Sequence, residues 1–337
     1  MGILICGLNG AGKSTLGKML ADRIGYTFID NEDLYFPKTD AGYLFANPNS
    51  REEAVRLLEE KIEGNRRFVF AAVKGDYGDK LTASLDCIVL VHVPKAIRSR
   101  RVRDRSFSRF GERMLPGGDL YERESAWFSL TDSRPEDYTE NWLETVHCPV
   151  ISVDGTLPPE QNIDYLASAV SVTPSGIYLC RIPSREEMER KWEDEIALHA
   201  EKQNWIVWKS EAVESAMTGR SLPYYGFLDG KIICEATAVL HPDIGLSGGD
   251  PDGAVELCAF RTNKAYRGQG WFSRLMDFLQ KDLKRKGYTK AIVGVEPCEA
   301  HNREIYHHWG FTEHVSSGTE TYPDGTVIQV DFYGKRL

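Results

Sequence analysis

The chain has 337 residues, of which 42% are hydrophobic and 27% are charged, as is typical of globular proteins rather than disordered or fibrous ones. This length suits two compact domains, each large enough to bury its own core. The net charge of −9 leaves no basic surplus to neutralise phosphates, which argues against a nucleic-acid-binding protein.

The 7 cysteines are spread along the chain without a CxxC pair or a Cys/His spacing that suits a metal. Free thiols of this kind favour a reducing compartment. No apolar run reaches the length of a membrane span, and the first residues show neither a basic leader nor a cleavage site. We therefore expect a cytoplasmic protein without membrane contact, which acts as a monomer or homodimer on small-molecule substrates.

The first half of the chain alternates short apolar segments with amphipathic ones. The apolar segments predict strands, and the amphipathic segments predict helices. Strands separated by helices predict an α/β domain over residues 1–172, with a parallel sheet flanked by helices. The predicted strands are 2–6, 26–29, 68–73, 87–93 and 149–153, and the predicted helices are 13–24, 51–62 and 159–170.

The second half has a different pattern, after a segment of linker composition, VTPSG, at residues 172–176. Two apolar runs around Asp229-Gly230 predict a hairpin. Neighbouring antiparallel strands together with helices predict an α+β domain with a mixed sheet over residues 176–337. The predicted strands are 178–182, two within 224–239, 255–262, 291–295 and 326–333, and the predicted helices are 185–200, 271–286 and 300–308.

A glycine-rich loop, which we call the phosphate loop (residues 7–15), begins Gly-Leu-Asn-Gly-Ala-Gly-Lys-Ser and matches GxxxxGK[ST] at every fixed position. It follows an apolar strand and opens a helix, so its backbone N–H groups can cradle phosphates. Lys13 can reach the β- and γ-phosphates, and the Ser14 hydroxyl can ligate Mg²⁺. The predicted ATP contacts are Gly7, Asn9, Gly10, Ala11, Gly12, Lys13, Ser14 and Thr15.

Two further features accompany the phosphate loop: an acidic cluster at residues 30–33 and an arginine-rich segment at residues 98–113. With them, residues 1–170 resemble P-loop small-molecule kinases of the shikimate, gluconate and nucleotide kinase kind. The resemblance implies ATP- and Mg²⁺-dependent phosphoryl transfer to a small molecule. The segment that binds nucleoside monophosphate in adenylate kinases and a clean shikimate-binding arginine pattern are both missing.

The resemblance gives Asp30 and Asp33 catalytic roles near Mg²⁺ and the acceptor hydroxyl. Their alternative role is to cap a helix and line a turn. Asp76 follows the third predicted strand, where ligands bind in open α/β sheets, so it is a candidate ligand of Mg²⁺ or substrate. With Ser14 and Asp30 it completes the predicted metal set.

Arginines at positions 101, 105, 109 and 113 recur every four residues, so they share one face if the segment is helical. In related kinases, arginines on a mobile lid close over the γ-phosphate, and the resemblance makes Arg105 and Arg109 the catalytic candidates. The alternative is a solvated helix face paired with nearby acids.

A second glycine motif, which we call the glycine turn, reads Arg267-Gly268-Gln269-Gly270 and lies between a strand and a long amphipathic helix. Backbone N–H groups at a helix N-terminus, with an arginine beside them, can bind a pyrophosphate. Together with the Tyr306 to Phe311 segment, this turn makes residues 176–337 resemble a GNAT-type N-acetyltransferase.

This second resemblance implies acetyl-CoA as cosubstrate, with its pyrophosphate on the glycine turn and its pantetheine along a strand that ends with Phe260 and Thr262. It implies that Tyr306 protonates the departing CoA thiolate, although Tyr306 could instead be a packing residue. An amine must lose a proton before it attacks a thioester, and Glu256 is the candidate base. Alternatively, Glu256 is an edge-strand carboxylate facing solvent, and Glu296 is a weaker second candidate.

These patterns support two functional hypotheses. The first is a bifunctional enzyme that phosphorylates a small molecule and acetylates an amine. The second is an acetyltransferase regulated by a domain that binds or hydrolyses nucleotide without a phosphate acceptor. The sequence names neither acceptor.

Overall fold

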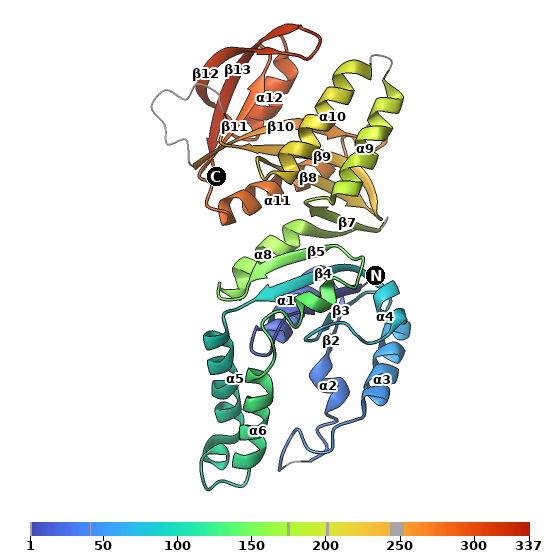
Figure 1. The fold of residues 1–337 in the computed structure, drawn as a ribbon, viewed down its shortest axis with the longest axis vertical. Coiled ribbons are helices and arrows are strands. Elements are labelled where there is room, and N and C mark those ends of the chain that lie inside the picture. Colours follow the sequence, from blue (N-terminus) through green and yellow to red (C-terminus); the bar gives the residue numbers. More distant parts are fainter. Residues whose placement is uncertain (1, 41, 174–175, 200–201, 243–252) are drawn as a thin grey trace. The chain divides into compact units, whose positions relative to one another are not determined.

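A computed structural model describes residues 2–40, 42–173, 176–199, 202–242 and 253–337 (Figure 1). The chain divides into two compact units, Met1–Ala167 and Ser168–Leu337. The linker expected at residues 172–176 is partly a strand. Strand β6 (Val170–Thr173) includes its first two residues and pairs antiparallel with β7 (Gly176–Arg181). The β-branched residues Val170, Val172 and Thr173 suit a strand better than a linker.

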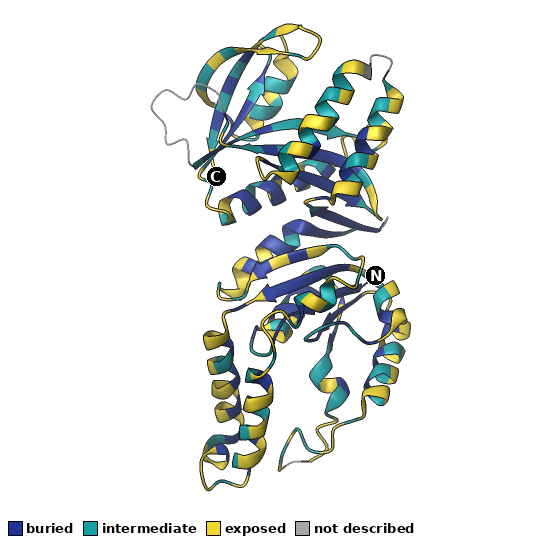
Figure 2. Cartoon of the chain, in the orientation of Figure 1, coloured by how far each residue is buried: buried dark blue, intermediate teal, exposed yellow. Residues whose placement is uncertain are grey.

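The N-terminal unit is built on a parallel five-stranded sheet of order β2-β3-β1-β4-β5, as predicted. The central strand is entirely apolar, and its Ile3, Leu4 and Ile5 have no exposed surface, because both faces of the sheet are covered. Figure 2 shows the buried residues concentrated in these strands. The strands are β1 Gly2–Cys6, β2 Thr27–Asp30, β3 Phe68–Ala71, β4 Leu85–His92 and β5 Val150–Asp154.

Helices of the N-terminal unit connect these strands and extend beyond them. α5 and α6 lie against each other, joined by the short 3₁₀ helix η1 (Gly111–Met114) (Figure 1). The tip of this pair packs Phe110, Met114 and Leu120 against Tyr43 and Phe45 of the segment after α2. The α-helices are α1 Lys13–Ile24, α2 Asn31–Tyr35, α3 Arg51–Gly64, α4 Asp79–Ala83, α5 Lys95–Phe110, α6 Tyr121–Asp132, α7 Glu140–Leu143 and α8 Pro159–Ala169.

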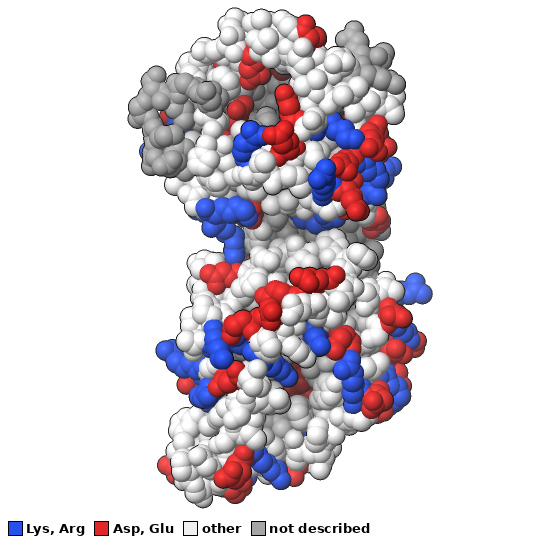
Figure 3. Space-filling view, viewed as in Figure 1, with Lys and Arg blue, Asp and Glu red and all other residues white. Residues whose placement is uncertain are grey.

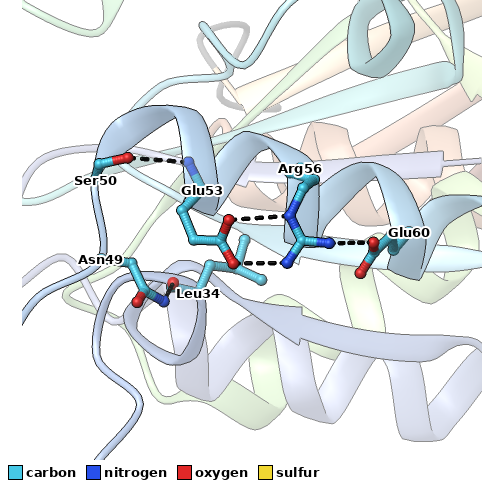
Figure 4. Close-up of polar contacts among 6 residues, drawn as sticks. All are labelled: Leu34, Asn49, Ser50, Glu53, Arg56 and Glu60. Atoms are coloured by element: carbon cyan, nitrogen blue, oxygen red, sulfur yellow. Dashed lines mark hydrogen bonds and ion pairs between the residues drawn. The ribbon is translucent and has the colours of Figure 1, made fainter.

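The start of α3 shows how local sequence fixes a helix end (Figure 4). The Ser50 hydroxyl accepts a hydrogen bond of 3.2 Å from the Glu53 backbone N–H, which satisfies one donor of the first turn. The Glu53 carboxylate also pairs with Arg56, one turn further along. Just before the cap, the Asn49 side chain donates to the Leu34 carbonyl oxygen at 2.8 Å, which ties the incoming segment to α2.

The C-terminal unit has an eight-stranded sheet of order β12-β13-β11-β10-β9-β8-β7-β6. Among the described strands of this sheet, β10 and β11 pair parallel and the other neighbours pair antiparallel. The sheet is therefore mixed, as predicted. The remaining strands are β8 Ser221–Leu228, β9 Lys231–Leu240, β10 Ala254–Thr262, β11 Lys290–Val295, β12 Glu313–Thr321 and β13 Val327–Arg336. The helices are α9 Arg185–Leu198, α10 Lys202–Met217, α11 Trp271–Arg285 and α12 Ala300–His308, with the 3₁₀ turn η3 at Lys264–Tyr266.

The two faces of this sheet are covered by different helices. The Tyr224 hydroxyl of β8 donates to Asp282 of α11 at 2.6 Å, whereas Glu235 of β9 pairs with Lys191 of α9. Tyr225 lies opposite Glu235 in the ladder, so adjacent tyrosines point to opposite faces. Tyr224 therefore lies on the face opposite to Trp205 of α10, whose ring packs near Trp192 of α9.

We call the face covered by α9 and α10 the α9–α10 face.

In the parts of the chain that the structure describes, no helix combines the length and the apolar character needed to cross a membrane.

Candidate active sites

The phosphate loop joins β1 to α1 and needs glycine at particular positions. Gly7, Gly10 and Gly12 have φ angles of +140°, +81° and +92°, which residues other than glycine rarely adopt. A Cβ at Gly10 would lie 2.4 Å from the carbonyl oxygen of Arg98. Among the described residues, no protein acceptor pairs with the backbone N–H groups of Gly10, Gly12, Lys13 or Ser14. These donors are therefore available to an anion at the N-terminus of α1.

Lys13 lies against this loop, where its Nζ donates to the Leu8 carbonyl oxygen at 3.1 Å. Burial lowers the pKa of Lys13 to about 8, and the nearby positive charge of Arg105 adds to the effect. A partly desolvated ammonium beside free backbone donors forms a strong site for a multiply charged anion.

Arg101, Arg105 and Arg109 share one side of α5, as predicted for a helical segment, but they make different contacts. Arg101 donates to the Gly155 carbonyl oxygen at 3.0 Å, and Arg109 lies 3.3 Å from the Glu32 carboxylate. Arg113 lies outside α5, in η1, where it pairs with Asp119 because the helix ends at Phe110. Arg105 has no hydrogen-bond or ion-pair partner in the described part of the chain. Its positive charge nevertheless helps to lower the pKa of Lys13, so these two cations lie within electrostatic reach of each other.

Arg134, which follows α6, contacts the phosphate loop although no sequence motif marks it. Its guanidinium donates to the Asn9 side-chain oxygen in the loop and lies 5.7 Å from the Tyr138 ring centroid. Lys74 lies 4.5 Å from the same ring, so two cations meet near the loop. The contact with Asn9 spans 125 positions, which is why the sequence did not reveal it.

Each of the three predicted carboxylates makes its own local contact. Asp30 caps α2 by accepting a hydrogen bond of 3.0 Å from the Glu32 backbone N–H. Asp33 pairs with Lys38, and Asp76 pairs with Lys74 at 3.2 Å. Within the described ranges, no group of three or more His, Cys, Asp or Glu side chains could hold a metal ion. The Ser14, Asp30 and Asp76 metal set therefore stays a prediction, in which phosphate oxygens would supply further ligands.

Two cavities border the phosphate loop. One of about 520 Å³ is lined by Gly7, Leu8, His92 and Glu136, among others. The other, of about 220 Å³, lies beside the start of α1 and is lined by Gly12, Thr15, Leu16, Arg101, Leu157 and Asn162, among others.

In the C-terminal unit, β10 separates from β11 at the position predicted for pantetheine. The parallel pairing stops at Leu257 and Val293, although β10 continues to Thr262 and β11 to Val295. A bulge at Ala259, whose φ is +54°, shifts the register between Cys258 and Arg261. The splayed edge leaves backbone groups of β10 that no longer pair with β11.

The glycine turn follows β10 and opens α11. Gly268 and Gly270 have φ angles of +72° and +80°, and Gly270 caps the helix. Arg267 Nε donates to the Thr262 carbonyl oxygen at 2.9 Å, which ties the turn to the end of β10. The turn is exposed, and the backbone N–H groups of Gly268, Gln269 and Gly270 have no protein acceptor among the described residues.

Tyr306 of α12 packs against the splayed strand, with its ring centroid 5.7 Å from that of Phe260. Burial raises the pKa of Tyr306 to about 12, and the Glu299 carboxylate adds to the shift. The phenol is therefore protonated at neutral pH. Phe272, in the first turn of α11, stacks on Trp309 with the ring centroids 5.4 Å apart.

Glu256 lies on β10 between β9 and β11, so it is not on an edge strand. It is half-buried and has no ion-pair or hydrogen-bond partner among the described residues. Burial raises its pKa to about 7, with a further contribution from Glu320. The charge of Glu256 raises the pKa of the Cys258 thiol, and Cys258 in turn raises the pKa of the Tyr306 phenol, so Cys258 lies within electrostatic reach of both groups.

Comparisons with known proteins give one family match in each half of the chain. Residues 183–311 match the model of the Acetyltransferase (GNAT) family, and residues 9–42 match that of Shikimate kinase. The shikimate kinase of Thermosynechococcus vestitus is 29% identical over 166 residues, covering 43% of this chain and 90% of that protein. An uncharacterized protein of Bacillus subtilis, YqaC, is 29% identical over 177 residues, covering 50% of this chain and 97% of that protein.

Solved structures with similarity to this chain include a putative acetyltransferase, yncA, of Salmonella typhimurium with its cofactor acetyl-CoA. It has a TM-score of 0.36 and 15% identity, and the match covers 48% of this chain and 94% of that one. A ribosomal-protein-alanine N-acetyltransferase of Brucella melitensis has a TM-score of 0.37 and 14% identity, covering 47% and 99%.

The chain joins a shikimate kinase-like domain to a GNAT-type acetyltransferase domain. The protein is therefore a transferase.

The GNAT-type domain also contains a buried polar cluster that no sequence pattern indicated. Lys191 and Glu235 are 7% and 3% exposed and form an ion pair. Arg261 joins the pair, 3.1 Å from the Glu235 carboxylate, and its guanidinium lies 4.7 Å from the Trp205 ring centroid. The cluster fixes α9 and the far end of β10 to β9, and its members are too distant in sequence for spacing to reveal it.

Proposed function

We propose that the protein is bifunctional. Its shikimate kinase-like domain transfers phosphate from ATP to a small molecule, and its GNAT-type domain transfers acetyl from acetyl-CoA to an amine. Two glycine-containing turns carry the proposal, and each lies at the start of a helix. In each turn, backbone N–H groups donate to no acceptor among the described residues. Each turn has its own positively charged side chain, Lys13 in one and Arg267 in the other.

In the kinase-like domain, the loop donors and Lys13 would hold the β- and γ-phosphates. Arg105, which has no protein partner in the described ranges, would neutralise charge that develops on the transferred group. Arg134 would hold the phosphate loop in place through its hydrogen bond to the Asn9 side chain. The 220 Å³ cavity beside Gly12 and Thr15 offers space for the nucleoside. Mg²⁺, bound by Ser14 and phosphate oxygens, would neutralise phosphate charge.

In the acetyltransferase domain, Glu256 would accept a proton from the substrate ammonium, either directly or through water. The neutral amine nitrogen then bonds to the thioester carbonyl carbon, and the C–S bond breaks. The CoA sulfur takes the proton of the Tyr306 phenol, and the nitrogen gives up its second proton to restore that phenol. The products are an amide and CoA–SH, and Glu256 releases its proton to solvent. A carboxyl with a pKa of about 7 suits the base role.

Two assays on the full chain test the proposal. ADP release is measured with a panel of acceptors that includes shikimate, gluconate and nucleoside monophosphates. We expect one acceptor class to raise ADP release and Lys13→Ala to abolish it. Acetyl-CoA should stabilise the protein by about 2.7 kcal/mol at a hundredfold excess over its dissociation constant. The absence of a thermal shift at millimolar acetyl-CoA would refute the acetyl-transfer assignment.

A further inference from the structure

Strand register places two acidic residues on the α9–α10 face. Glu256 of β10 lies beside Ile292 of β11, and Ile292 lies opposite Gly334 of β13. Every second residue of β13 from Gly334 back to Ile328 shares that face, and Ile328 lies opposite Glu320 of β12. The negative charge of Glu320 reaches Glu256, which supports their proximity.

Other acidic residues extend this group. Glu296 directly follows β11, is half-buried, and its charge acts on Glu320. Figure 3 shows several acidic side chains around a hollow on the visible face of this unit, in the region where Figure 1 draws α10, α12 and the β12–β13 hairpin.

Among the described residues, Glu256, Glu296 and Glu320 form no ion pair. Lys191 and Arg261 lie on the same face, and both are bound to Glu235. Burial, together with neighbouring negative charge, raises the pKa values of Glu256 and Glu320. The free protein therefore keeps an uncompensated negative field next to the splayed strand, which concentrates cations there.

A polar atom outside the carboxylate group also lacks a partner. Asn204 of α10 donates through Nδ2 to Asp324 at 2.7 Å, and its side-chain oxygen is buried without a donor in the described part of the chain. Nearby, Trp208 of α10 packs edge-on to Tyr322 at 5.5 Å. The charges of Glu296, Glu320 and Asp324 all act on Tyr322, so these carboxylates lie within electrostatic reach of the contact between α10 and the β12–β13 hairpin. A buried acceptor without a donor is costly.

We infer that the acetyl acceptor is a diamine or polyamine, with one nitrogen at Glu256 and a second ammonium held by Glu296, Glu320 and the aromatic edge of α10. This inference rests on the proposed acetyl transfer and narrows its substrate class. A dication balances the group, and aromatic rings add cation–π attraction to an ammonium. A monoamine would leave the second set of carboxylates unpaired.

The test uses the full chain, acetyl-CoA, and two amines of equal carbon length, n-butylamine and putrescine. We expect kcat/KM for putrescine to exceed that for n-butylamine by about tenfold or more, the value of one charge-assisted contact. Added salt should reduce this preference, because the attraction is electrostatic. Spermidine should also be a substrate.

Glu320→Gln should lower kcat/KM for putrescine about tenfold and leave n-butylamine unchanged. The matched control is Glu313→Gln on the same strand, because Glu313 is paired with Lys290 at 2.8 Å. It should change neither amine. Equal rates for the two amines, or equal effects of the two variants, would overturn the inference and leave acetyl transfer intact.

A thermal-shift measurement covers the case in which neither amine is acetylated. With CoA bound, putrescine should raise the melting temperature of the wild type and not that of Glu320→Gln. No shift with putrescine refutes the inference. No shift with acetyl-CoA refutes the proposed acetyl transfer itself, so the two failures are distinguishable.

Discussion

Arg134 donates a hydrogen bond to the side chain of Asn9, which joins the segment after α6 to the phosphate loop across 125 positions of sequence. Arg134 is half-exposed and also lies against Tyr138, so it holds the loop without being part of the core. The contact brings a permanent positive charge to the place where phosphate charge would gather.

We predict that Arg134→Gln lowers kcat/KM for ATP by about tenfold to a hundredfold, because one charge-assisted contact to phosphate is lost. The free energy of unfolding should change by less than about 1 kcal/mol, as for other exposed pairs. Arg103→Gln is the control, since Arg103 pairs with Asp132 away from the loop. Equal losses in the two variants would contradict a role for Arg134 at the phosphates.

Lys13 should make ATP affinity depend on pH. Its pKa is about 8 in the free protein, and bound phosphates should raise it, so ATP binding takes up a proton above pH 8. We expect the dissociation constant to increase by up to about tenfold per pH unit there, measured by calorimetry. Lys13→Arg should bind without this slope, because a guanidinium stays charged. A flat wild-type profile would contradict the prediction.

The same group also affects folding. Between pH 8 and its unfolded value of 10.5, the unfolded chain holds more protons at Lys13 than the folded protein. This group therefore makes the free protein more stable as pH rises through that window. Lys13→Ala should lack this contribution, as measured by denaturant unfolding at several pH values.

Glu256→Gln should lower kcat of acetyl transfer by about a hundredfold or more, because the base is removed. In the wild type, kcat/KM should rise with pH through about 7, where Glu256 loses its proton. The raised pKa means that the folded protein holds more protons than the unfolded chain between 4.5 and about 7. The contribution of Glu256 to stability is thus lost as pH rises through this range, and the Glu256→Gln variant should melt at a higher temperature than wild type at pH 8.

Tyr306→Phe should reduce kcat about tenfold to a hundredfold with little change in KM for acetyl-CoA, because only the proton donor is removed. The ring contact with Phe260 should survive, so the melting temperature should stay close to that of wild type. A rise in KM without loss of kcat would show that Tyr306 binds the cosubstrate rather than protonating its thiolate.

The sequence predicted the fold where periodicity and turn chemistry were strong. The parallel sheet of the first domain, the mixed sheet of the second, and helix Ala300–His308 were predicted correctly. The Asp229-Gly230 turn also forms, with both residues at positive φ. β12 was missed because its sequence, EHVSSGTET, is polar and contains glycine. α10 was missed because its apolar residues are not confined to one helical face.

The sites were predictable only where function needs a contiguous motif. The phosphate loop and glycine turn are local, so their spacing is visible in the sequence. Arg134 and the Lys191–Glu235 pair depend on which elements pack together, and nothing local marks them. The spacing of Arg113 was misleading, because the helix ends at Phe110 before reaching it.

The two proposed transferase activities should be separable by mutation. The most direct measurement records ADP release with a phosphate acceptor and CoA release with putrescine for the wild type, Lys13→Ala and Glu256→Gln. We predict that Lys13→Ala loses only ADP release and that Glu256→Gln loses only CoA release. Two results together would contradict this prediction: Lys13→Ala also loses CoA release, and no acceptor stimulates ADP release by the wild type. The first domain would then be a nucleotide-dependent regulator.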